Sequence, residues 1–148
     1  MDMRFQHGAT HLLCAPSGAG KTYSVATILR HRKDMIPEGA AIKNVIFFYN
    51  VLQDLYDELK EEGVVTKWVQ KRPTNDEFIE HVKDFKHDGG SIAVIDDWME
   101  AIDSDLATIV TVTARHYLTT TYILFQSLFP PHPMARQISL NVKYVHGL

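Results

Sequence analysis

The sequence has 148 residues, enough for one domain with a central sheet and its covering helices. Apolar residues make up 45% of the chain and charged residues 22%, a balance that is typical of globular soluble proteins. The net charge of −3 gives no support to wholesale nucleic-acid binding, although a ring subunit that holds DNA needs basic residues only on its channel loops.

Short apolar runs alternate with longer amphipathic segments, which predicts a mostly parallel sheet with helices on its faces. The first strand is expected over residues 10–15, because this apolar run breaks at Pro16. Residues 21–32 have apolar positions at helical spacing and a basic end, so they predict a helix. No linker or repeat divides the chain, and residues 1–148 are therefore predicted to form a single domain.

The next segments predict two more strands with a helix between them. Residues 44–50 are nearly all apolar, as expected for a strand buried on both faces of a sheet. A helix follows and stops at Gly63, and residues 64–69 predict a third, more polar strand. The apolar positions of the helix before Gly63 are Leu52, Leu55, Tyr56 and Leu59.

The second half of the chain repeats this alternation. Thr74 and Glu77 form a capping-box pattern that starts a helix, which ends near residues 89–90. A fourth strand is expected over residues 92–95 and a helix over residues 105–117. Two further strands are expected at residues 121–126 and 142–146. The sum is about six strands and four or five helices, which predicts an α/β sandwich of three layers.

Residues 15–22 carry the phosphate-loop pattern [AG]xxxxGK[ST] between a predicted strand and a predicted helix. Its glycines let backbone amides turn toward phosphates, Lys21 adds positive charge at the β- and γ-phosphates, and Thr22 offers a hydroxyl to Mg²⁺. A chance match in a glycine-containing turn is the alternative, but chance matches seldom fall between a strand and a helix. The predicted nucleotide-binding residues are Ala15, Pro16, Ser17, Gly18, Ala19, Gly20, Lys21 and Thr22.

The strand at residues 92–95 ends in two carboxylates, Asp96 and Asp97. An apolar strand with this ending resembles the Walker B strand that holds magnesium beside a phosphate loop. Asp96 is then the magnesium-linked carboxylate, together with Thr22, and Asp97 is the base that polarises the attacking water. An ordinary strand-to-turn boundary is the alternative, and the preceding phosphate loop favours the catalytic interpretation.

Two residues complete the predicted catalytic set. Gln126, at the tip of the strand after Asp96, is expected to sense the γ-phosphate and orient water, unless it only caps a sheet edge. Transition-state charge in such enzymes is often stabilised by an arginine from a neighbouring subunit. Arg115 and Arg136 follow the Walker B strand and are candidates for this role, with a surface position as the alternative.

This order of motifs resembles the genome-packaging ATPases of large DNA viruses, such as poxviruses, and of Polinton (Maverick) virus-like elements. These belong to the FtsK/HerA-like branch of P-loop ATPases. The resemblance covers nearly the whole chain and is carried by LLCAPSGAGKT, NVIFFYN, IAVIDD, ILFQSLF and ISLNVKYV. Its more specific parts are Gln126 with Phe129, and the turn at residues 139–141. Arg115-His116 departs from the histidine pair that such proteins often have at this place.

The resemblance implies an ASCE/RecA-like P-loop fold that binds ATP and Mg²⁺ between the subunits of a homo-oligomeric ring. It also implies that hydrolysis drives double-stranded DNA into a viral capsid, with capsid or portal proteins as partners, in the host nucleus, the cytoplasm or the virion. The sequence stops at its last predicted strand, so assembly or grip on DNA is expected to need other parts or partners. A single cysteine and no long apolar run predict a soluble, intracellular protein with no membrane partner.

A P-loop kinase, another ASCE ATPase and a nucleotide switch are the alternatives to a packaging ATPase. A P-loop kinase for small molecules or nucleotides would carry lid arginines and place its acceptor strand beside the phosphate-loop strand. The arginine-poor residues 42–70 and the position of Gln126 argue against it, whereas another ASCE ATPase, such as a helicase-like one, stays open. A nucleotide switch would need an Asn/Thr-Lys-x-Asp segment, which is absent from the sequence. Lys67, Lys71 and Arg72 form either a DNA-channel loop or a solvated charge cluster.

Overall fold

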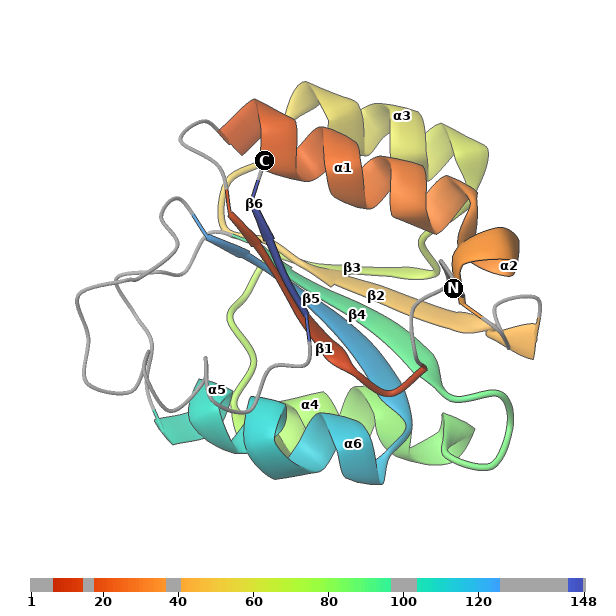
Figure 1. Cartoon of the computed structure of the whole chain (residues 1–148), viewed down its shortest axis with the longest axis vertical. Helices are drawn as coiled ribbons and strands as arrows, with labels where there is room; N and C mark the ends of the chain where they lie inside the picture. The colour runs from red at the N-terminus through yellow and green to blue at the C-terminus, as the bar shows by residue number, and fades with distance from the viewer. Residues whose placement is uncertain (1–6, 15–17, 37–40, 97–103, 126–143, 148) are drawn as a thin grey trace.

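A computed structural model describes residues 7–14, 18–36, 41–96, 104–125 and 144–147. Within these residues, six strands join into one sheet (Figure 1). The strands are β1 (Thr10–Cys14), β2 (Asn44–Phe48), β3 (Lys67–Val69), β4 (Ser91–Asp96), β5 (Thr119–Phe125) and β6 (Tyr144–Gly147). The helical segments are α1 (Gly18–Arg30), α2 (Arg32–Met35), α3 (Asp54–Glu62), α4 (Asn75–Val82), α5 (Ser104–Thr108) and α6 (Ala114–His116), with a 3-10 turn η2 (Lys83–Phe85) and a π-helical segment η4 (Ile109–Thr113).

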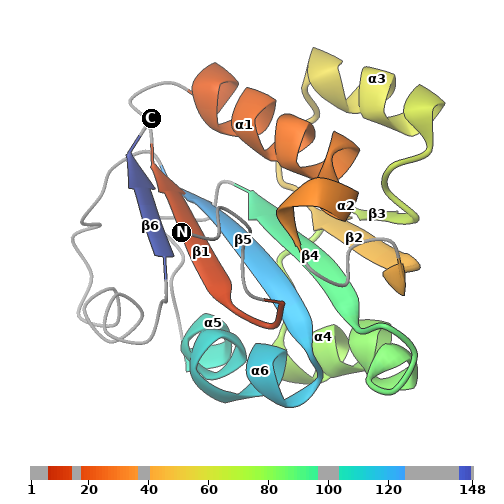
Figure 2. The same cartoon turned by 45° about the vertical axis from the view of Figure 1, so that its right-hand side comes forward.

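The strand order is β3-β2-β4-β5-β1-β6, and every pairing in the sheet is parallel. Helices α1 and α3 cover one face, and α4, α5 and α6 cover the other (Figure 2). The chain moves outward along the sheet from β1 to β3 and then returns through β4 to β5. Because parallel crossovers are right-handed, this reversal sends the later helices to the opposite face. The predicted three-layer α/β fold is confirmed.

The neighbouring apolar strands β2 and β4 are buried on both faces. In β2, Val45 and Phe47 pack on the side of α1 and α3, whereas Ile46 and Phe48 pack on the side of α4 and α6. The same alternation runs along β4, since successive side chains of a strand point to opposite faces. The last residue of β4, Asp96, therefore falls on the side of α3.

Several predicted elements differ from the observed ones in their limits. The third strand is only three residues long and lies at the edge of the sheet, where Lys67 is exposed. Leu52 was predicted on the apolar face of the helix that stops at Gly63, but it lies before α3 and is 52% exposed, so that assignment was wrong. The capping box of Thr74 and Glu77 is confirmed at the start of α4.

The predicted helix over residues 105–117 is divided into α5, η4 and α6. Its middle is a run of β-branched residues, which crowd the preceding helical turn. The hydroxyls of Thr108 and Thr111 also donate to the carbonyls of Ser104 and Ala107, one turn earlier. Hydrogen bonds of this kind bend helices, and they account for a wider turn here.

We expect Gly90→Ala to destabilise the fold much more than Gly63→Ala. Both glycines have positive φ, +73° and +70°, which costs an alanine roughly 1–2 kcal/mol. A Cβ on Gly63 meets nothing within 4 Å, whereas one on Gly90 would lie 2.2 Å from the carbonyl oxygen of Leu118. Chemical denaturation should therefore show a loss of roughly 3 kcal/mol or more for Gly90→Ala. Equal losses for the two variants would contradict the close approach at Gly90.

Candidate functional site

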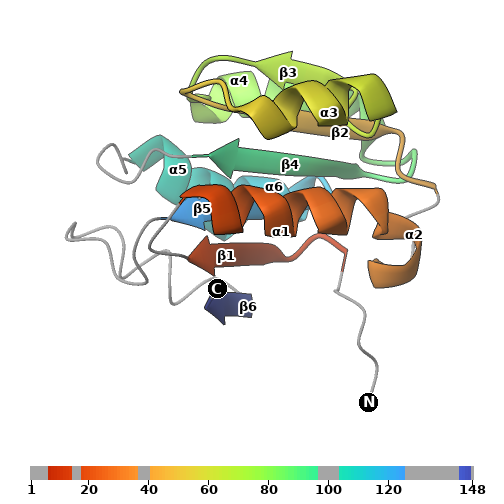
Figure 3. The ribbon, with the colours of Figure 1, turned by 90° about the horizontal axis from the view of Figure 1, so that it is seen from above.

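Three strands end at the same edge of the sheet, and each leads into a motif predicted from the sequence. Cys14, the last residue of β1, pairs with Phe125 of β5, and Asp96 of β4 pairs with Leu124 of β5. Because β5 lies between β1 and β4, the ends of those two strands are about 10 Å apart. Figure 3 shows β1 and β4 running to this edge, where α1 begins. The carboxyl edge of the sheet is thus the common origin of the predicted site.

The phosphate-loop pattern spans the turn from β1 into α1. Ala15, Pro16, Ser17 and the side chains of residues 18–22 lie outside what the structure describes. The backbone of Gly18 already belongs to α1, three residues before the predicted start. Val25 and Leu29 are fully buried beneath this 13-residue helix, which fixes the helix on the sheet. Its first turn, whose backbone amides have no acceptor within the helix and whose dipole end is positive, therefore lies at the carboxyl edge.

Asp96 is a buried carboxylate, with a side chain 2% exposed. Its Oδ2 accepts hydrogen bonds from the hydroxyl of Tyr56 and from Nε2 of Gln53, the latter at 3.3 Å. Both donors come from the start of α3, which packs on the face of the sheet where Asp96 lies (Figure 1). Hydrogen bonds to a carboxylate are stronger than those between neutral groups, so these donors fix the orientation of Asp96.

Tyr56 is itself held by three other aromatic side chains. Its ring centroid lies 4.8 Å from that of Phe47, 5.6 Å from that of Tyr49 and 5.4 Å from that of Trp68. From the sequence, Tyr56 was expected only as an apolar position of a helix, and Gln53 was not singled out. The missed signal was the hydroxyl, because a tyrosine at a core position needs a hydrogen-bond partner for its polar end.

The oxygen ligands predicted for a metal are the Asp96 carboxylate and the Thr22 hydroxyl. Magnesium prefers oxygen ligands and is usually held by one or two carboxylates together with substrate phosphates. This donor set fits Mg²⁺ with a bound nucleotide. Within the described ranges, no group of three or more His, Cys, Asp or Glu side chains could hold a metal ion by itself.

Asp97 and Gln126 lie outside the described residues, but each directly follows a described strand end. Asp97 comes after Asp96 of β4, and Gln126 comes after Phe125 of β5. The attachment points of both residues are therefore brought to the same edge as the phosphate loop. The roles predicted for their side chains stay predictions, and so does that of Arg136, which also lies outside the described residues.

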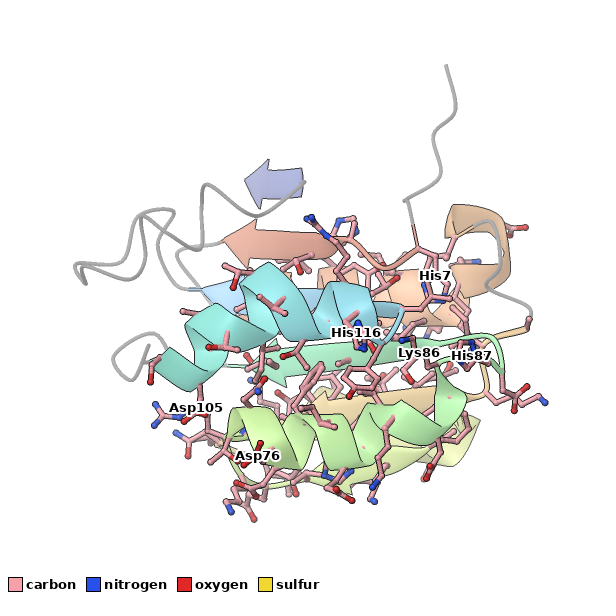
Figure 4. The ribbon with its side chains drawn as sticks, turned by 90° about the horizontal axis from the view of Figure 1, so that it is seen from below. His7, Asp76, Lys86, His87, Asp105 and His116 are labelled. Atoms are coloured by element: carbon pink, nitrogen blue, oxygen red, sulfur yellow. The ribbon has the colours of Figure 1, made fainter. Side chains whose placement is uncertain are left out.

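Arg115 is not part of this cluster. It belongs to α6, which ends just before β5 begins, so it lies toward the amino edge of the sheet. Strand β5 has seven residues, which places its carboxyl end about 20 Å away. Figure 4 shows neighbouring His116 beside Lys86, whose Nζ is 3.1 Å from Nε2 of His116, while Asp105 marks the opposite end of this helical segment. Arg115 is exposed, and at this distance its side chain does not reach the carboxyl edge of its own sheet.

One of the basic residues suggested for a DNA channel is engaged within the chain. Lys71 Nζ lies 2.5 Å from the Glu77 carboxylate at the start of α4. The hydrogen bond from Lys71 lowers the pKa of Glu77 below its ordinary value. This contact favours a solvated charge cluster over a DNA contact for Lys71.

Comparisons with known proteins give no family for this chain. No protein-family model matches it, and a search of curated proteins found no match. Within the described residues, none of the helices has the length and apolar character needed to cross a membrane.

Proposed function

We propose that the chain is a P-loop ATPase that binds and hydrolyses ATP at the carboxyl edge of its sheet. The observation that carries this proposal is the common edge of β1, β4 and β5. It places the start of the phosphate loop, the buried carboxylate of Asp96 and the attachment of Gln126 next to one another. In open α/β sheets, ligands bind in the crevice outside the carboxyl ends of the strands.

Each residue of the set has a distinct part in the proposed reaction. The amides of residues 15–20 and the ammonium of Lys21 would hold the phosphates, and Asp97 would polarise the attacking water. Gln126 would orient that water toward the γ-phosphate. Thr22 and Asp96 would hold Mg²⁺, which neutralises charge that develops on the phosphate oxygens.

The strand order supports hydrolysis over transfer to a small acceptor. A kinase of the P-loop class was expected to place its acceptor strand beside the phosphate-loop strand. In this sheet β1 is hydrogen-bonded to β5 and β6, and not to β2 or β4. The strand between β1 and β4 instead ends where Gln126 begins. A water-orienting residue inserted between the phosphate loop and Asp96 suits a hydrolase.

We further propose that hydrolysis drives double-stranded DNA into a viral capsid. This part rests on the resemblance of the motif order to viral packaging ATPases. A ring of identical subunits would allow Arg115, exposed and far from its own site, to act on the nucleotide of a neighbour. Capsid or portal proteins would be the partners, in an infected cell or in the virion.

ATP turnover by the purified chain, measured with and without long double-stranded DNA, tests both parts of the proposal. We expect Mg²⁺-dependent release of phosphate that DNA stimulates. Asp97→Asn should lower turnover by roughly 100-fold or more, because the attacking water loses its base. No turnover under any condition would contradict the ATPase proposal. Turnover that DNA does not stimulate would contradict a packaging motor. Phosphorylation of a small acceptor would favour a kinase.

A further inference from the structure

We propose that Tyr56, assisted by Gln53, is a positioning residue for the magnesium-linked carboxylate and couples the occupied site to helix α3. This inference rests on the proposed ATPase function, since it assigns Asp96 to Mg²⁺. The contact joins residues 40 positions apart in the chain, on β4 and on α3. It thus links the metal side of the site to an element that carries none of the predicted motifs.

Packing alone does not account for a tyrosine at this position. The ring is fully buried and its neighbours Phe47, Tyr49 and Trp68 are aromatic, so a phenylalanine would fill the same space. The hydroxyl adds a polar group to an apolar environment, which costs free energy unless it is hydrogen-bonded. It donates to Asp96, the one carboxylate that the sequence assigned to the metal. The hydroxyl is therefore explained by Asp96.

The arrangement fixes one oxygen of the carboxylate before any nucleotide binds. Gln53 Nε2 donates to the same Oδ2 from the residue just before α3, so two donors converge on one atom. Partners that hold a metal-binding carboxylate in this way set its orientation, and their loss typically weakens metal binding by about 10- to 100-fold. Any shift of Asp96 when Mg²⁺ and nucleotide bind would be passed to Tyr56 and the start of α3.

Trp68 offers a direct readout of this coupling. Its ring lies 5.4 Å from that of Tyr56 and 4.9 Å from that of Phe47, so movement of Tyr56 changes the surroundings of the indole. The sequence has two tryptophans, and the other, Trp98, can be replaced by phenylalanine to leave a single reporter. In that background we expect Mg²⁺ with ATP to change Trp68 emission, and Tyr56→Phe to abolish the change.

The decisive experiment measures binding of a fluorescent ATP analogue with and without Mg²⁺ to the full chain. Tyr56→Phe should weaken binding in the presence of Mg²⁺ by about tenfold and leave metal-free binding unchanged. Tyr49→Phe is the control, because it removes a hydroxyl from the same aromatic cluster. Gln53→Ala removes the second donor without touching the buried ring, and Gln70→Ala is its control, since Gln70 donates to the carbonyl of Asn50 instead.

The outcomes separate this inference from the proposed function. A wild-type chain that binds no nucleotide overturns both. Wild-type binding that Mg²⁺ strengthens, with Tyr56→Phe equal to wild type, overturns only the positioning role. Equal losses with and without Mg²⁺ also overturn it, because they indicate a general packing defect. If Tyr56→Phe does not fold, Gln53→Ala decides by the same criterion: a loss confined to Mg²⁺ supports the role, and no loss overturns it.

Discussion

Replacing Lys21 with alanine is expected to lower ATP hydrolysis by roughly 100-fold or more and to weaken ATP binding with and without Mg²⁺. Lys21 follows Gly20 on the first turn of α1, at the carboxyl edge where β1, β4 and β5 end. In the proposed site, an ammonium there would meet the β- and γ-phosphates, and the other phosphate ligands would be neutral amides. Its removal therefore takes away the one point charge that the phosphate-loop pattern supplies.

Lys83→Ala is the appropriate control for this loss of a positive charge. Lys83 begins η2, on the other face of the sheet from α1, and pairs with Glu80 at 3.0 Å. Its alanine variant should bind and hydrolyse ATP as the wild type does. Phosphate release and equilibrium binding of ATP measure both variants. A Lys21→Ala protein that keeps wild-type ATP affinity would show that residues 15–22 are not a nucleotide site.

The fold was predictable where the sequence contains strong local signals. The apolar run that became β2 predicted a strand buried on both faces, because apolar side chains on both sides leave no solvent face. The hydroxyl of Thr74 and the carboxylate of Glu77 predicted the start of α4, since they bond to each other's backbone amides. Gly63 predicted the end of α3 because it tolerates a left-handed backbone.

The arrangement of the site was harder to predict from the sequence. The order of strands depends on long-range pairing, so no local pattern placed β5 between β1 and β4. The contact between Tyr56 and Asp96 joins two elements that helical and strand periodicity treat separately. Arg115 was a candidate for a neighbouring subunit's site because it follows the Walker B strand, and that position did not predict that the helical segment before β5 holds it toward the amino edge of its own sheet. Chain order alone therefore did not predict which side chains lie close together.

Asp96→Asn is expected to abolish Mg²⁺-dependent hydrolysis, with a loss of at least about 100-fold, while leaving the fold nearly as stable as before. Asparagine has the shape of aspartate and keeps an oxygen that can accept from the Tyr56 hydroxyl and from Gln53. The free energy of unfolding should therefore change by no more than about 1 kcal/mol. The missing charge removes a magnesium ligand, so Mg²⁺ should no longer strengthen ATP binding.

Asp97→Asn distinguishes the role of Asp97 in activating water from the role of Asp96 in holding Mg²⁺. It should also stop hydrolysis, because the water loses its base, but Mg²⁺ should still strengthen ATP binding since Asp96 is intact. Denaturant unfolding, ATP binding with and without Mg²⁺, and phosphate release, measured on both variants, give the comparison. If Asp96→Asn instead strongly destabilises the chain, and the fraction that folds retains turnover, the buried carboxylate stabilises the fold and is not a magnesium ligand. The Tyr56–Asp96 contact would then be a core hydrogen bond between α3 and β4, and the metal would have to be held by other residues.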